Sequence, residues 1–305
     1  MPDVDPQILT SPLALAAIIG LLLVGGGLAS LAVAVVDGRH PERRPTASDV
    51  TWPQLGVGLA LYLGLSVIGS ILFFSGASQS WSHDAGDFDV QVTFEGVTPS
   101  VTGLLAVTAL AQLAFALPAL LAAWRATRRA RQAGGEAVPL AGPVGLAQLG
   151  LGLGRSARRS SLVTGLLVVL LAAPLLMGFN ALWGAGWVFV TGELPVQDVA
   201  ELIDGANGLE FLPILLLAGI VIPFVEELFF RGVLLGFLEV RLGTVRALLV
   251  SSLVFAALHG LYASGPIFAL AIVMGLTMVR TRNLMVPFAI HALNNLIQVL
   301  LLALS

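Results

Sequence analysis

The sequence has 305 residues, of which 57% are hydrophobic and only 11% are charged. An ordinary soluble domain carries roughly 25% charged residues, so this composition excludes a soluble globular protein and favours a bundle of membrane helices. The net charge of -3 is too small to indicate a partner. The sequence has no cysteine, which excludes disulfide bridges, thiolate metal sites and a cysteine nucleophile.

Apolar runs that are long enough to cross a hydrocarbon core of about 30 Å recur along the chain. The first run follows Asp3 and Asp5 and lacks the basic segment of a signal peptide, so we expect it to be retained. The runs predict an all-α fold, a polytopic membrane helix bundle with about eight transmembrane helices. The predicted spans cover about residues 11–36, 53–75, 101–124, 161 onward, 209–238, 247–262, 265–279 and 284–304.

The loops between these spans predict the orientation of the chain. All basic residues are arginines, and outside the spans they fall only in alternate loops, near 39–44, 125–159, 241–246 and 280–282. Short loops that are rich in arginine remain in the cytoplasm, so we expect both termini outside. The arginine-only composition and the lack of an organelle signal favour a bacterial inner membrane.

Away from their ends, the predicted spans contain few strongly ionisable residues, and these include Glu226, Glu227, Arg231, His259 and His291. A charge at the centre of a membrane helix costs about 2.5 to 3.5 kcal/mol unless it is paired or hydrated. We therefore expect these side chains to face one another. Glu227 and Arg231 have the spacing of a helical ion pair, and Glu226, about 100° around the helix, can point elsewhere.

Distance along each helix places the polar residues at a similar depth. At a rise of 1.5 Å per residue, Glu226 and His259 lie about 22 Å and 20 Å from the cytoplasmic arginines of their own helices. His291 and Asn295 lie about 13 Å and 20 Å from theirs. Polar groups that serve only packing have no reason to share one layer, so this agreement favours a common site.

Three motifs in this part of the chain resemble those of a known family. Residues 226–232 read EELFFRG and match an EExxxR motif, residues 255–259 read FAALH and match FxxxH, and His291 precedes Asn295 by four residues. The motifs and their order are similar to those of the CAAX-protease and bacteriocin-processing (CPBP, ABI) family of intramembrane glutamic endopeptidases. The resemblance covers roughly the last 100 residues.

The resemblance implies a peptide hydrolase in which a glutamate and a histidine activate water. Carried over by position, Glu226 would be the general base, and His259 would hold and polarise the water. His291 and Asn295 would stabilise the oxyanion that forms on the peptide carbonyl. The ion pair of Glu227 would support these groups.

Zinc chemistry is an alternative for the same residues. Glu226, His259 and His291 could bind zinc, because two histidines and a carboxylate leave one coordination position for water. We rank a metalloprotease below the metal-free mechanism, because the sequence lacks HExxH and Asn295 is not a usual zinc ligand. We therefore expect no cofactor.

Two other functional classes remain as alternatives. A proton-coupled transporter would also place glutamate and histidine at mid-depth, but it should show paired broken helices or repeats, which this sequence lacks. A non-catalytic bacteriocin-immunity or partner-binding membrane protein would keep the fold without the chemistry. Such a protein would tolerate Glu226→Gln.

The chain is expected to have two regions. Residues 1–160 would form an amino-terminal membrane region with three spans and a basic cytoplasmic loop, and residues 161–305 would form the peptidase core. The expected partners are a peptide or membrane-tethered protein substrate and the lipid bilayer, with no nucleic acid. The resemblance implies prenylated CAAX proteins as substrates in eukaryotes, and peptide maturation or bacteriocin immunity in bacteria.

Overall fold

The computed structural model describes residues 52–74, 78–84, 87–93, 155–192 and 208–304, together with a few positions in a further segment, which are 108, 111, 112, 116, 120 and 121. The predicted span at about 11–36 lies outside the described residues. So does the predicted span at 101–124, apart from the six single positions.

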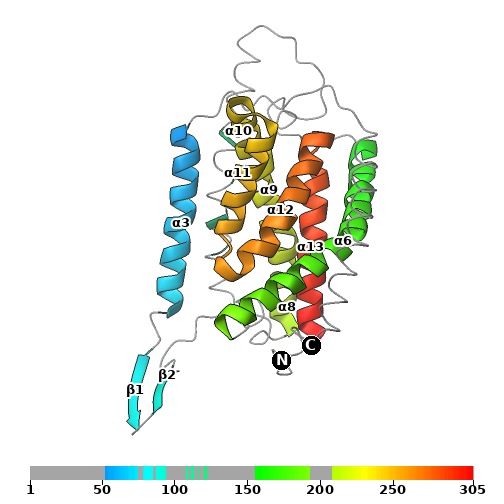
Figure 1. Ribbon diagram of the computed structural model, residues 1–305. Helices are drawn as coiled ribbons and strands as arrows, with labels where there is room; N and C mark the ends of the chain where they lie inside the picture. Colours follow the sequence, from blue (N-terminus) through cyan, green and yellow to red (C-terminus); the bar gives the residue numbers. More distant parts are fainter. Residues whose placement is uncertain are drawn as a thin grey trace.

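The described chain consists of long helices and one short hairpin (Figure 1). In chain order the elements are α3 (Trp52–Phe74), β1 (Ser78–Asp84), β2 (Asp87–Thr93), α6 (Arg155–Thr191), a helical segment from Gly208 to Leu242, α11 (Thr244–Ala257), α12 (Leu261–Thr281) and α13 (Met285–Leu304). The predicted helical fold is confirmed for these residues. The exception is the antiparallel pair β1–β2, where Ser78 faces Thr93, in a segment that we predicted as a loop.

Four of the described helices are long and apolar enough to cross a membrane. They are Leu162–Thr191, Phe211–Leu242, Leu261–Thr281 and Met285–Leu304. They correspond to the fourth, fifth, seventh and eighth predicted spans. The sixth predicted span contains a shorter apolar helix, Thr244–Ala257. The total of about eight spans depends on segments outside the described residues and stays a prediction.

The helical segment from Gly208 to Leu242 changes its hydrogen-bonding pattern along its length. It is composed of α8 (Gly208–Leu216), the π-helical turn η2 (Leu217–Val221), α9 (Ile222–Glu227), the π-helical segment η3 (Leu228–Leu234) and α10 (Leu235–Leu242). π-Helical turns within α-helices occur frequently at functional sites. Glu226 and Glu227 end the short α-helical stretch between the two π-helical segments.

Pro223 accounts for a contact between η2 and α13. The N–H of Ile222 donates to the carbonyl of Leu217, five residues back. The same pattern would pair residue 223 with the carbonyl of Ala218, but proline has no N–H to donate. The side-chain amide of Asn295 in α13 donates to this carbonyl instead, at 3.0 Å. The proline thus leaves an acceptor that ties the two helices together.

The core lies where η3, α10, α11, α12 and α13 meet. α11 packs against α12, and α12 packs against α13 (Figure 1). Large side chains that are almost completely buried fill this region, among them Phe230, Phe237, Phe255, Met274 and Ile290. α6 also packs closely on α13, because a Cβ atom added at Gly165 would lie only 2.5 Å from the Cβ atom of Ala289.

α11 ends earlier than the sequence predicts. The predicted span continues to residue 262, but the helix stops at Ala257 and α12 begins at Leu261. Between them Gly260 adopts φ 81°, a backbone conformation that glycine reaches without steric cost. His259 therefore lies in a turn beside the core and not within a helix.

Candidate active site

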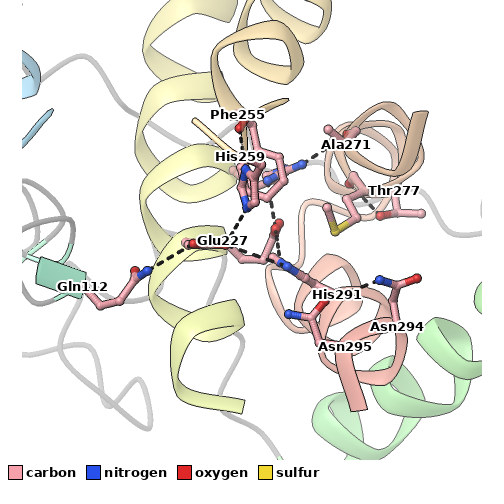
Figure 2. Close-up of polar contacts among 12 residues, drawn as sticks. Gln112, Glu227, Phe255, His259, Ala271, Thr277, His291, Asn294 and Asn295 are labelled. Carbon is pink, nitrogen blue, oxygen red and sulfur yellow. Dashed lines mark hydrogen bonds and ion pairs between the residues drawn. The ribbon is translucent and has the colours of Figure 1, made fainter. Parts of the chain in front are cut away.

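The structure brings together five of the predicted site residues, of which Figure 2 labels Glu227, His259 and His291. They come from three parts of the fold: the junction of α9 and η3, the turn after α11, and α13. The five residues are Glu226, Glu227, Arg231, His259 and His291, and each is within 4.0 Å of another member of the group. The predicted common site is thus supported by direct contacts between distant segments.

The ion pair expected from the four-residue spacing is present. Arg231 Nη1 lies 2.8 Å from Glu227 Oε1, and the two side chains are 2% and 0% exposed. Arg231 also donates from Nη2 to the carbonyl of Ala271 in α12, at 3.3 Å. Its guanidinium carbon lies 4.5 Å from the centre of the Phe255 ring. Two buried charges of opposite sign therefore satisfy one another inside the bundle.

Glu227 also fixes the ring of His291. Nδ1 of His291 lies 3.1 Å from Glu227 Oε1, the oxygen that binds Arg231. An ionised carboxylate only accepts hydrogen bonds, so the hydrogen of this contact belongs to Nδ1 of the histidine. Neutral His291 then has no hydrogen on Nε2, and this atom is an acceptor.

His259 is held in the same tautomer by a different partner. Its Nδ1 lies 2.8 Å from the carbonyl oxygen of Phe255. A carbonyl oxygen also only accepts, so Nδ1 is again the donor and Nε2 of the neutral ring is free to accept. The aromatic ring of Phe255 contacts both imidazoles, at centroid distances of 4.6 Å to His259 and 5.6 Å to His291. Phe255, which is 1% exposed, therefore sets the spacing of the two histidines.

Both Nε2 atoms face the same oxygen of Glu226. Glu226 Oε2 lies 3.8 Å from Nε2 of His291 and 4.0 Å from Nε2 of His259. These distances are too long for direct hydrogen bonds. They leave room for a water molecule that donates one hydrogen to Glu226 Oε2 and the other to one of the two Nε2 atoms. A water held in this way would keep an oxygen lone pair available for attack on a carbonyl carbon.

Exposure indicates which side of the site is open. The side chain of His259 is 28% exposed, whereas those of Glu226 and His291 are 6% and 5% exposed. The site is therefore most accessible beside His259, in the turn after α11.

Gln112 is a site residue that the sequence reasoning missed. Its Nε2 donates to Glu226 Oε1 at 3.2 Å, and both side chains are buried. The predicted site residues were ionisable side chains within the spans or members of the three motifs, and Gln112 is neither. The available signal was a glutamine inside the apolar run 101–124, since polar side chains within membrane helices commonly bond across helices.

Asn295 occupies a different place from the other predicted residues. Its amide donates to the carbonyl of Ala218 in η2, at 3.0 Å, and its side-chain oxygen accepts from Asn294 at 3.4 Å. Figure 2 shows Asn295 close to His291 on α13. One of its amide hydrogens is therefore used in packing two helices, and the other is the hydrogen that could serve an oxyanion.

A zinc ion would bind the same three side chains that would hold the water, which are Glu226, His259 and His291. Within the ranges that the structure describes, no group of three histidine, aspartate or glutamate side chains is arranged to hold a metal ion. Both imidazoles have an acceptor at Nδ1, a feature that metal-bound histidines share with catalytic ones. A metal ion bound here would make hydrolysis sensitive to a chelator, whereas water activated without a metal would not.

Comparison with known proteins gives one match. No curated protein and no solved structure matches the chain. Residues 208–297 match a family model described as type II CAAX prenyl endopeptidase Rce1-like, and this segment contains all six predicted site residues. The resemblance found in the three sequence motifs is thus confirmed. The similarity to the Rce1-like family, a CPBP family of CAAX endopeptidases, covers residues 208–297.

Proposed function

We propose that this protein is an intramembrane endopeptidase in which Glu226, His259 and His291 activate a water molecule for attack on a peptide bond. The observation that carries the proposal is the approach of two imidazole Nε2 atoms to one oxygen of Glu226, at 3.8 and 4.0 Å. The family of the domain supports peptide hydrolysis as the reaction.

The reaction would proceed without a covalent intermediate. The water oxygen attacks the carbonyl carbon of the peptide bond while one of its protons passes to Glu226 Oε2, which acts as the general base. The carbonyl oxygen becomes the oxyanion of a tetrahedral intermediate. The carbon–nitrogen bond then breaks as the proton is delivered to the leaving amine, so that the products are a carboxylate and an amine.

The oxyanion requires hydrogen-bond donors, and we assign this role to His291 and Asn295. Nε2 of His291 lies 3.8 Å from Glu226 Oε2, so the proton that Glu226 takes from the water can pass to this nitrogen before it reaches the leaving amine. While the proton rests there, the N–H can donate to the oxyanion, and Glu227 at Nδ1 balances the charge of the ring. Asn295 can contribute its second amide hydrogen. Removal of one oxyanion donor typically lowers kcat by about 10²- to 10³-fold.

The proposed substrate is a peptide or a membrane-tethered protein. The matched family is described as prenyl endopeptidases, which makes prenylated CAAX proteins one class to test. The arginines in alternate loops favour both termini outside, and the arginine-only composition favours a bacterial inner membrane. Water would enter past His259, the most exposed of the three reacting side chains.

The test is cleavage of a quenched peptide library by the purified protein in detergent. Wild type is compared with Glu226→Gln and His259→Ala, each with and without a chelator. We expect cleavage by wild type that either substitution abolishes and that the chelator leaves unchanged.

Other outcomes point to the alternative functions. Loss of activity with chelator and its return with zinc would replace the proposal by a metalloprotease. Equal cleavage by wild type and Glu226→Gln would remove Glu226 as the base. If no peptide or membrane-tethered substrate is cleaved, the domain is a non-catalytic immunity or partner-binding protein.

A further inference from the structure

We propose that Gln112 is a positioning residue for Glu226, and that the amino-terminal region thereby completes the active site. This inference rests on the proposed function, because it assigns Gln112 a role in the reaction of Glu226. Gln112 lies outside the matched segment 208–297, so the family resemblance does not assign it any role.

The contact fixes the orientation of the glutamine. Gln112 Nε2 lies 3.2 Å from Glu226 Oε1. Because an ionised carboxylate cannot donate, the amide nitrogen must face it, and the amide oxygen must point away. Gln112 and Glu226 are 4% and 5% exposed, so water competes little for this hydrogen bond.

The hydrogen bond gives the two carboxylate oxygens of Glu226 different partners. Oε1 of Glu226 accepts from Gln112, which leaves Oε2 facing the two histidines. The terminal torsion of a glutamate side chain is broad and only weakly restricted by its own geometry. An external donor is therefore needed to keep Oε2 directed at the water, and Gln112 supplies that donor. In Figure 2, Gln112 lies to the left of Glu227 and His291 to its right.

Gln112 is buried in contact with Glu226. Among the described residues, its amide nitrogen donates to Glu226, and its Oε1 is buried without a hydrogen-bond partner. A buried polar group needs hydrogen bonds to offset the loss of water, and the bond to Glu226 serves this need at one end of the amide. The neighbouring positions Ala111 and Ala116 are also buried, and such small side chains allow membrane helices to approach closely.

The experiment uses the full-length protein in detergent and measures kcat and KM separately. Gln112→Met keeps the length of the side chain and removes the donor, and Gln112→Asn keeps the amide on a side chain too short to reach. Leu120→Ala is the matched control, because Leu120 lies in the same segment and is 52% exposed.

We expect both Gln112 variants to lower kcat by about tenfold to a hundredfold, the usual effect of a misplaced reacting group. KM should stay within about threefold of the wild-type value, because substrate binding does not depend on this contact. Leu120→Ala should behave as wild type. A wild-type kcat in Gln112→Met, or an effect on KM alone, would overturn the proposal.

A spectroscopic readout separates this proposal from the proposed function. The infrared carboxylate band of Glu226 is identified as the band lost in Glu226→Gln, and it should shift in Gln112→Met because a hydrogen bond to the carboxylate is removed. An unchanged band contradicts the positioning role even in a protein that cleaves nothing. A shifted band without any Glu226-dependent cleavage rejects the proposed function alone.

Discussion

Glu227 carries two contacts on a single oxygen. Its Oε1 accepts from Nη1 of Arg231 at 2.8 Å and from Nδ1 of His291 at 3.1 Å. The first contact neutralises a buried charge, and the second orients a proposed reacting group. One side chain therefore serves both the stability of the bundle and the geometry of the site, and substitutions can separate the two roles.

The substitution Glu227→Gln is expected to lower both stability and activity. It leaves Arg231 buried without a counter-charge, and breaking a buried pair in this way costs about 3 to 5 kcal/mol. The double variant Glu227→Gln with Arg231→Met removes both charges and should recover much of the lost thermal stability. Its activity should stay at least about a hundredfold below wild type, because His291 still lacks the carboxylate that supports its protonated form.

Thermal unfolding in detergent and peptide cleavage are measured on the same preparations. The single variant Arg231→Met provides the control for the loss of the guanidinium. Recovery of both stability and activity in the double variant would show that Glu227 matters only as the partner of Arg231.

Residue spacing predicted most of the site, and the reason is physical. Buried charges in lipid must find partners, so the positions of Glu226, Glu227, Arg231, His259 and His291 along the chain are enough to assign them to one site. The same reasoning gives no information about an uncharged side chain. Gln112 was therefore missed, although it contacts Glu226 directly.

At the scale of elements, Pro223 and Asn295 form a linked pair. Pro223 cannot donate to the carbonyl of Ala218, and Asn295 donates to it instead. In the wild-type background, Asn295→Leu should therefore lower the free energy of unfolding by about 0.6 to 1.7 kcal/mol, the range for hydrogen bonds between membrane helices.

The loss should shrink in a Pro223→Ala background, because residue 223 then has an N–H that can reach the Ala218 carbonyl. The coupling is measured as a double-mutant cycle from equilibrium unfolding of the four proteins. If Asn295→Leu destabilises both backgrounds equally, the proline does not create the need for Asn295.

Two features of the helices could not be predicted from the sequence. The pattern of apolar residues indicates a helix from about 209 to 238, but it does not reveal where hydrogen bonds shift by one residue to form η2 and η3. Similarly, the apolar run continues beyond Ala257, so the pattern of apolar residues does not show where α11 ends. Glycine at position 260 is a signal for a turn, and φ 81° at that residue shows why this signal outweighs the apolar pattern.

At the scale of the whole molecule, the distribution of arginine predicts an orientation that can be measured. The natural sequence has no cysteine, so single cysteines can be introduced without removing others. Val245 lies between two arginines and is 71% exposed. Thr191 is an exposed residue at the carboxy-terminal end of α6, whose amino-terminal end carries arginines.

We expect a membrane-impermeant maleimide to label Thr191→Cys in right-side-out vesicles and Val245→Cys in inside-out vesicles. The expectation follows from the retention of arginine-rich loops in the cytoplasm. Labelling of Val245→Cys from the outside would reverse the proposed topology, and labelling of both positions from one side would change the number of spans between them.

The fold as a whole was predictable to the level of a helical membrane bundle. Composition and the length of the apolar runs predict this fold class, because backbone N–H and C=O groups in lipid must be hydrogen-bonded within the protein, which leaves few possible structures. The hairpin β1–β2 was not predicted, since its residues 78–93 read as a polar loop between two apolar runs. Contacts such as those of Gln112, which join the amino-terminal region to the core, also required the structure.

The measurement that tests the central claim most directly is an experimental density map of the site that resolves ordered water and distinguishes zinc by its anomalous signal. We predict one water within about 2.7 to 3.2 Å of Glu226 Oε2 and of at least one histidine Nε2, without an anomalous peak. Imidazole rings that turn their Nε2 atoms away from Glu226, or a zinc peak between the three side chains, would contradict this account.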